Sequence, residues 1–174
     1  DSMKGVYVRH NKYIASNGNI LVEINTKPKR ENINKILNAF PKKNDDQGKY
    51  IDAKFPNYKA VIPEYDNFSN FVELNPIVDQ LYSLIQFFKP YKKYYGFWST
   101  NGNVAINTKK SPLFNVDFFY NALKALKDNG AKKIKIGYRI DRPLLVKTDN
   151  GHQALIMPIR RYFENGKEQF ADPF

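Results

Sequence analysis

Few side chains in this sequence have the type and spacing that catalysis requires. The 174-residue chain has no cysteine, which removes thiol nucleophiles, disulfides and thiolate metal sites. Its two histidines, His10 and His152, have no metal-ligand spacing around them, so we expect both in a surface or hairpin position. The carboxylate pair Asp45 and Asp46 lies in a polar run typical of a solvated loop. The sequence therefore predicts no catalytic residue, no metal site, no cofactor and no enzymatic activity.

The other chemistry that these residues could support is polyanion binding. The chain has 28 Lys and Arg against 17 Asp and Glu, a formal net charge of +11 at pH 7. A basic surface attracts phosphates and releases their counterions, so nucleic acid is the expected partner. The alternative is that the charge serves solubility alone, because basic charge does not by itself specify a ligand.

The composition predicts a folded chain. Hydrophobic residues make up 42% of the sequence, and a domain of about 150 residues buries roughly two-thirds of its unfolded surface. No apolar run approaches the roughly 18 residues of a membrane span, and the first residues have no signal-peptide core. We therefore expect a cytoplasmic protein with no membrane partner.

Three segments have the apolar spacing of an amphipathic helix. Residues 31–40 place four apolar side chains on one stripe. Residues 75–88 begin with an Asn cap followed by Pro, and residues 116–127 are stopped by the Asn-Gly pair at Asn129.

The remaining segments have the patterns of strands. Residues 13–22 and 96–106 each place Asn-Gly between β-branched and aromatic runs, which predicts two tight hairpins. Their similarity indicates either an internal repeat or coincidence. Residues 133–140, 144–148 and 153–160 also read as strands. Strands and helices in this order predict an α+β fold, with antiparallel sheets and helices on one face.

Four short motifs occur in the same order as in a known family. Residues 55–63, Phe-Pro-Asn-Tyr-Lys-Ala-Val-Ile-Pro, resemble the segment between the second and third domains of the bacterial DNA polymerase III β subunit, the sliding clamp. Residues 154–160 are similar to that family's closing strand, and residues 14–21 resemble its Ala-Thr-Asp-Gly-x-x-Leu hairpin. Residues 114–126 are similar to the strand and helix of its last domain. The resemblance spans residues 5–161 and implies a DNA-clamp-like fold.

The chain also departs from that family. A full bacterial clamp subunit is about twice as long and has three domains, so we expect a shortened, divergent member, such as a phage or mobile element could carry. We expect a contracted or N-terminally incomplete clamp-like domain at 1–54, with an N-terminal helix missing. A domain resembling the last clamp domain is expected at 55–161. The tail at 162–174 has a Gln-plus-aromatic pattern similar to clamp-binding peptides, and a disordered or strand-paired end is the alternative.

The resemblance implies a surface for duplex DNA. In the clamp family, helices line the pore and present basic side chains to the phosphate backbone, so binding is non-specific and salt-sensitive. On this chain the corresponding residues are Lys29, Arg30, Lys35, Lys124 and Lys127. The alternative is an ordinary solvated helix face.

The resemblance also implies a pocket for short peptides of polymerases and clamp loaders. Carried over residue by residue, its lining is Ser16, Asn19, Leu21, Pro56, Ala60, Val61, Leu155 and Met157. Ala60 replaces a usual basic residue, and Ser16-Asn17 stands where the family has Thr-Asp. Plain core packing is the alternative for Val61, Leu155 and Met157.

The function implied is that of a sliding clamp. Such a processivity factor encircles duplex DNA as a homo-oligomeric ring and tethers a replicative polymerase through the peptide pocket. The alternative is a monomeric basic interaction protein that has kept a clamp-like scaffold and binds a replication protein or nucleic acid.

Overall fold

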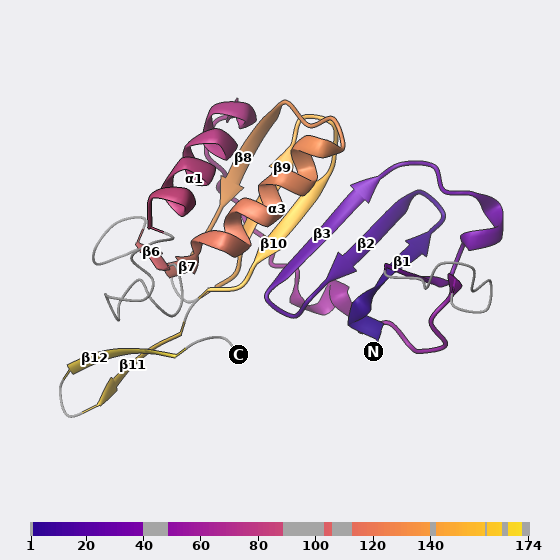
Figure 1. Ribbon diagram of the computed structural model, residues 1–174, viewed down its shortest axis with the longest axis horizontal. Coiled ribbons are helices and arrows are strands. Elements are labelled where there is room, and N and C mark those ends of the chain that lie inside the picture. Colours follow the sequence, from indigo (N-terminus) through magenta and orange to yellow (C-terminus); the bar gives the residue numbers. More distant parts are fainter. Residues whose placement is uncertain are drawn as a thin grey trace.

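A long antiparallel sheet organises the molecule, in a computed structural model that describes residues 2–39, 49–88, 103–105, 113–139, 142–158, 160–164 and 167–171. Its eight strands lie in the order β4-β1-β2-β3-β10-β9-β8-β5 (Figure 1). They are β1 (Gly5–Arg9), β2 (Lys12–Ser16), β3 (Ile20–Asn25), β4 (Ile36–Asn38), β5 (Val72–Glu73), β8 (Lys133–Gly137), β9 (Leu144–Thr148) and β10 (Gln153–Ile156). The pairing of β3 with β10 joins segments more than a hundred residues apart into one surface.

Two helices cover one face of half of this sheet. α1 (Leu74–Phe88) and α3 (Val116–Asp128) pack together over β8, β9 and β10 (Figure 1). The Asn115 side chain caps α3 by accepting hydrogen bonds from the backbone N–H groups of Asp117 and Phe118, at 2.9 and 3.3 Å. Leu74 and Leu123 are fully buried in the core that results. The predicted α+β fold with helices on one face is confirmed, as are the second and third helices.

The first predicted hairpin is also confirmed, as β2 and β3. Its turn follows from local chemistry, because Gly18 takes a φ of +89° that other residues rarely adopt. The Asn17 side chain accepts hydrogen bonds from the backbone of Asn19 and Ile20, at 3.0 and 2.9 Å. Most of the second predicted hairpin, residues 96–106, lies outside the described residues.

The helix predicted for residues 31–40 is wrong. A 3₁₀ turn, η2 (Arg30–Asn32), is followed by β4. Asn34 has a φ of +63°, which interrupts any α-helix, and its N–H donates to the carbonyl of Val8 at 2.8 Å. The outer edge of β1 thus pairs with this segment, and the hydrogen bonds of the sheet override the helical spacing of its apolar residues.

Short elements complete the chain. They are the 3₁₀ turns η1 (Ser2–Lys4) and η4 (Tyr58–Val61), the pair β6 (Asn103–Ala105) with β7 (Leu113–Asn115), and the hairpin of β11 (Arg160–Glu164) with β12 (Lys167–Ala171). The strand predicted to reach residue 160 ends at Ile156, and the tail is strand-paired in that hairpin.

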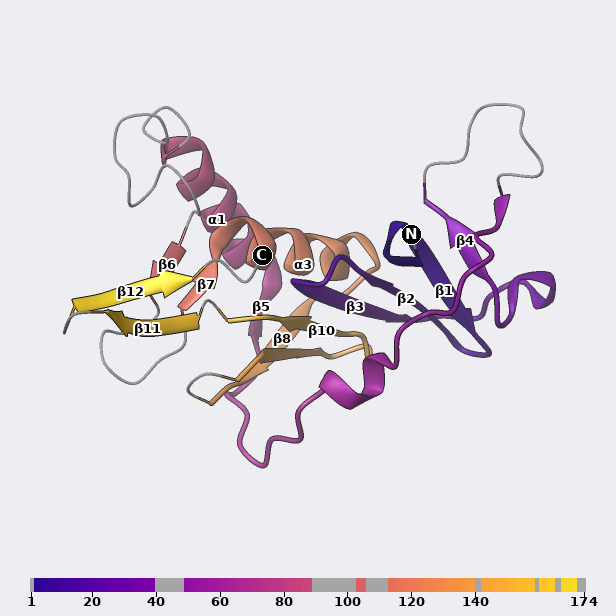
Figure 2. The same ribbon diagram turned by 90° about the horizontal axis from the view of Figure 1, so that it is seen from below.

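The two faces of the sheet have different covers. Residues 49–71, called the linker from here on, cross the face opposite α1 and α3 (Figure 2). Phe55 stacks on Tyr7 with ring centroids 5.1 Å apart, and Tyr58 is buried. We call this face the linker side and the other the helix side.

One of the two histidines is not at the surface. His152 follows the turn between β9 and β10, yet it is only 5% exposed. Its Nδ1 accepts from the backbone N–H of Asn25 at 3.1 Å, and its Nε2 lies 3.0 Å from the carbonyl oxygen of Asn129. Of the two expected positions, His152 has the hairpin one but not the surface one, because its buried imidazole joins β3 to the end of α3.

Neither α1 nor α3, the α-helices within the described ranges, is long and apolar enough to cross a bilayer.

Candidate DNA and peptide interfaces

Charge is divided unequally between the two sides of the sheet. Side chains alternate along a strand, so the registers assign each strand residue to one side. All charged residues of the eight strands lie on the linker side: Arg9, Lys12, Glu23, Glu73, Lys133, Lys135 and Lys147. The helix side of these strands is uncharged. Ionic recognition on that side therefore depends on the helices.

The linker side carries an apolar cluster around one cross-strand row. Leu155 pairs with Leu21 on β3 and with Leu145 on β9, and all three are at least 95% buried. Met157 packs against this cluster, and its N–H donates to the carbonyl of Asn19 at 2.8 Å. The hairpin, the linker and the segment after β10 therefore meet at one place.

The structure brings together part of the predicted peptide pocket. Leu21 and Leu155 form its buried floor, and Ser16, Asn19 and Met157 are half-buried beside them. The linker residues of the predicted set are exposed: Pro56, Ala60 and Val61. Val61 is 49% exposed and is not part of the buried cluster.

Two polar residues of the predicted pocket differ in whether their side chains have hydrogen-bond partners. The Ser16 hydroxyl donates to the carbonyl of Ile20 at 2.9 Å and accepts from the N–H of Gly18, so it shapes the turn. The Oδ1 atom of Asn19 is buried with no hydrogen-bond partner among the described residues. A buried acceptor without a donor is costly.

A buried carboxylate near the cluster was not foreseen from the sequence. Glu23 is 3% exposed, and its Oε2 accepts from Lys12 Nζ at 3.0 Å and from Gln153 Nε2 at 2.7 Å. Burial raises the pKa of Tyr58 in the linker, and the charge of Glu23 raises it further. Alternation along β3 places Glu23 on the linker side, but only the folded linker shows that this position is buried.

The helix side has a shallow surface between α1 and α3. A cavity of about 380 Å³ is lined there by Val78, Asp79, Tyr82, Ser83, Tyr120, Lys124, Lys127 and Asp128. Lys127 Nζ lies 3.2 Å from Asp79 Oδ1, and Lys124 pairs with Asp128 one turn along α3. Two of the five residues predicted to bind DNA, Lys124 and Lys127, thus lie together, each beside an exposed carboxylate.

The other three predicted DNA-binding residues lie elsewhere. Lys29, Arg30 and Lys35 precede β4 at the far edge of the sheet from the helices (Figure 2). The ammonium of Lys35 lies 4.3 Å from the ring centroid of Tyr50. None of these three residues lies on an α-helix, whereas Lys124 and Lys127 lie on α3.

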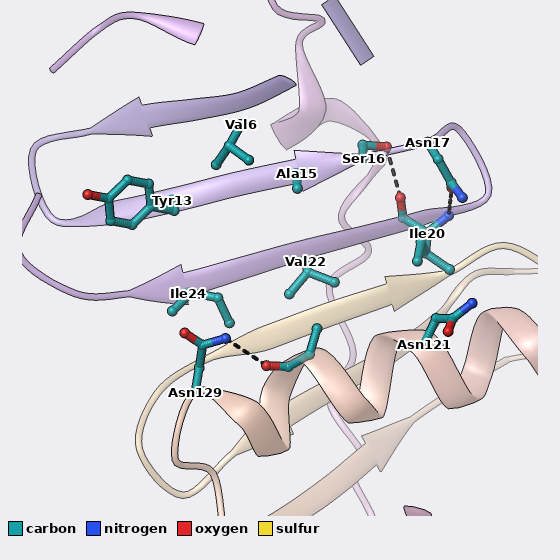
Figure 3. Close-up of a pocket in the computed structure, with 11 residues that line it drawn as sticks. Val6, Tyr13, Ala15, Ser16, Asn17, Ile20, Val22, Ile24, Asn121 and Asn129 are labelled. Atoms are coloured by element: carbon teal, nitrogen blue, oxygen red, sulfur yellow. Dashed lines mark hydrogen bonds between the residues drawn. The ribbon is translucent and has the colours of Figure 1, made fainter. Parts of the chain in front are cut away.

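An apolar groove opens on the helix side where the helices stop. Its volume is about 450 Å³, and none of its lining residues is charged (Figure 3). The floor is the cross-strand row Val6, Ala15 and Val22, and one wall is α3, with Asn121 and Ala125. The groove exists because α1 and α3 cover β8–β10 and leave β1 and β2 bare (Figure 1).

No group of three or more His, Asp or Glu side chains within the described ranges is placed to hold a metal ion.

Comparison with solved structures identifies the fold. The chain is similar to DNA polymerase III subunit beta from Borrelia burgdorferi, with 14% identity and a TM-score of 0.59 over 92% of this chain and 57% of that one. It is similar to the beta subunit from DNA polymerase of Streptococcus pyogenes, with 11% identity and a TM-score of 0.63 over 91% and 58%. It is also similar to the DNA polymerase III beta subunit from Thermotoga maritima, with 16% identity and a TM-score of 0.56 over 91% of this chain and 58% of that one.

These likenesses show a sliding-clamp fold and confirm the expected clamp-like architecture. No family model and no curated protein matches the sequence. The chain spans less than three-fifths of the clamps it matches, at 57% and 58% of their lengths.

Proposed function

We propose that this protein is a shortened sliding-clamp-like processivity factor. It associates with duplex DNA through the helix side and with polymerase or clamp-loader peptides through the linker side. The observation that carries the proposal is the match of nearly the whole chain to sliding clamps, at 91% and 92% coverage. We also propose a cytoplasmic location and a phage or mobile-element origin.

The duplex surface is proposed at α1 and α3. Lys124 and Lys127 lie on this face, and each is held only by an exposed ion pair. Such pairs contribute about 0–1 kcal/mol, so phosphates can displace the carboxylates at little cost. Contacts of this kind reach the backbone and carry no sequence information, as a sliding protein requires.

The peptide surface is proposed at the cluster around Leu21, Leu155 and Met157. Met157 is half-buried and adaptable, which suits an anchor for varied peptides. The Oδ1 of Asn19 beside it has no donor among the described residues, and it could accept from a peptide N–H only after the side chains that bury it move. Exposed Pro56, Ala60 and Val61 form the rim on the linker.

We propose a homo-oligomeric ring, with domains at 1–54 and 55–161 and a tail at 162–174. The sheet ends at β5, whose outer edge pairs with no other described strand, and the apolar groove lies uncovered over β1 and β2. An unpaired strand edge and an exposed apolar face are surfaces through which subunits can associate head to tail.

Topological retention tests this function. The protein is bound to nicked circular plasmid, and free protein is removed at a salt concentration that suppresses phosphate contacts. A ring stays on the circle and leaves when a restriction enzyme cuts the DNA, while light scattering gives a multiple of the chain mass. A strict monomer that leaves circular and linear DNA equally would support a basic interaction protein instead.

A further inference from the structure

Two lysines face each other across the linker side of β8 and β9. Lys135 pairs with Lys147 in the register of these strands. Their ammonium groups lie 5.2 and 4.7 Å from the centroid of the same ring, Phe68 of the linker. Like charges directly opposite on neighbouring strands are destabilising, and the ring offsets only part of this repulsion.

These lysines differ from the neighbouring cations in lacking a carboxylate. Lys12 pairs with Glu23, Lys133 with Glu73 and Arg139 with Asp66. Within the described part of the chain, neither Lys135 nor Lys147 has an ion pair. An anion bound between them would relieve their repulsion without breaking any existing ion pair.

An exposed aromatic ring adjoins this pair. Phe71 is 47% exposed, and its ring centroid lies 5.3 Å from Lys135 Nζ. Tyr65 packs edge-on against Phe68 at 6.4 Å, which fixes the ring beneath the lysines. Cations beside an accessible aromatic face are the combination that holds single strands, because phosphates meet the charges and a base stacks on the ring.

We propose that Lys135, Lys147 and Phe71 form a binding site for single-stranded nucleic acid. The phosphate backbone lies over the two lysines, and one base stacks on Phe71. An acidic peptide would use the charges alone and would leave the ring of Phe71 uncovered. The site is on the opposite side of the sheet from α1 and α3, so it is distinct from the proposed duplex surface.

The site also differs from the proposed peptide surface. Lys147 pairs with Gln153, whereas Leu145, two residues earlier on β9, pairs with Leu155 of the apolar cluster. The two sites therefore occupy neighbouring rows of the sheet and can be altered separately. The proposal holds whether or not the chain forms a ring.

Fluorescence anisotropy with a labelled oligo(dT) of about 15 nucleotides tests the proposal. We expect the double variant Lys135→Gln, Lys147→Gln to weaken binding at least tenfold, and to lower the salt slope by about 0.7 for each phosphate that the variant no longer binds. The control Lys27→Gln, Lys132→Gln removes the same charge from two exposed loop positions and should weaken binding less than threefold. Lys135→Arg, Lys147→Arg should retain binding.

The aromatic contribution is tested separately. Phe71→Leu should weaken oligo(dT) binding about fivefold or more, since it removes the stacking and keeps the charge. The same variant should not change binding of an abasic oligonucleotide. Phe71→Trp should retain or tighten oligo(dT) binding.

Two outcomes would overturn the site. One is equal weakening by the lysine pair and its loop control, with thermal melts showing that both variants are folded. The other is loss of poly-glutamate binding in the lysine variant with no effect of Phe71→Leu on oligo(dT), which would assign the surface to an acidic peptide. Duplex binding by Lys124 and Lys127 is measured in parallel, so failure here does not count against the proposed function.

Discussion

Two pairs of lysines, one on the helix side and one on the linker side of the same sheet, have different partners. On the helix side, where the strands themselves have no charged residue, Lys124 and Lys127 of α3 stand beside carboxylates. On the linker side, Lys135 and Lys147 stand beside an aromatic ring without a carboxylate. Net charge alone therefore does not locate a polyanion site. The residue that already contacts each lysine decides whether an anionic ligand must displace a carboxylate or can bind without doing so.

The two sides differ in packing as well. α1 and α3 fill the helix side over β8–β10, whereas the linker covers its side with aromatic rings, and there β2 and β3 hold an ion pair between Lys12 and the buried Glu23. The helix side is thus held by apolar contacts that tolerate conservative change. The linker side combines an apolar cluster with a few polar contacts that are less tolerant of change.

The largest effect should come from the buried carboxylate of the linker side. Glu23→Ala should lower the free energy of unfolding by roughly 3 kcal/mol, because it removes two hydrogen bonds from the half-buried Lys12 and Gln153 to a charged acceptor, each contributing about 1.5 kcal/mol or more. Urea denaturation measures this. Glu31→Ala, which removes an exposed ion pair with Lys49, is the control and should change it by less than about 1 kcal/mol. A loss at Glu23 no larger than at Glu31 would contradict the difference between the sides.

The next effect concerns peptide binding. Met157→Asp should abolish binding of a polymerase-derived peptide, since burying one aliphatic anchor contributes roughly 1.5–3 kcal/mol. Calorimetric titration measures it, and Met3→Asp, the same change at a residue 46% exposed, is the control. Unfolding by Met157→Asp would show that the residue is core and that the pocket assignment fails.

On the helix side the sign of the effect should depend on which member of a pair is changed. Lys124→Gln with Lys127→Gln should weaken duplex binding and lower the salt slope by about 0.9 for each phosphate left unbound. Asp79→Asn with Asp128→Asn should instead tighten it, because the lysines are freed from their competing carboxylates. Filter binding across a salt series checks both. Identical behaviour of the two double variants would exclude this surface.

The smallest effect should appear at alkaline pH on the linker side. Burial raises the pKa of both Tyr58 and Tyr65, and the Tyr65 hydroxyl donates to the carbonyl of Pro143. A raised pKa means that the neutral form is favoured in the folded state. Its stabilisation is complete below the usual tyrosine pKa of about 10 and is lost as pH rises through the higher folded value.

Unfolding free energy measured from pH 8 upward should therefore fall more steeply for the wild type than for Tyr58→Phe with Tyr65→Phe. The control Tyr138→Phe changes a tyrosine that is 55% exposed and should follow the wild type. Parallel curves for all three proteins would show that the linker tyrosines do not titrate with unfolding.

The sequence predicted the elements whose signals are local. Asn17 and Gly18 determine the first turn, and Asn115 caps α3 through its own side chain. The segment around Asn34 was wrongly predicted as a helix because its structure depends on hydrogen bonds to β1. The spacing of its own apolar residues does not reveal that partner. No local spacing shows that the edge of a sheet needs a strand.

The candidate sites divide in the same way. Leu21, Leu155 and Met157 could be placed together from the resemblance, since motif order carries long-range information. Glu23, His152 and the lysine pair at Lys135 could not, because their burial or pairing depends on the linker and on strand register. Both are properties of the folded chain.

Lysine acetylation footprinting by mass spectrometry tests the division between the two sides most directly. The protein is acetylated alone, with duplex DNA and with oligo(dT), each at low salt. Duplex should protect Lys124 and Lys127 and leave Lys135 and Lys147 reactive, while oligo(dT) should give the reverse pattern. Protection of Lys135 and Lys147 by duplex, with Lys124 and Lys127 unchanged, would contradict the assignment of duplex DNA to the helix side.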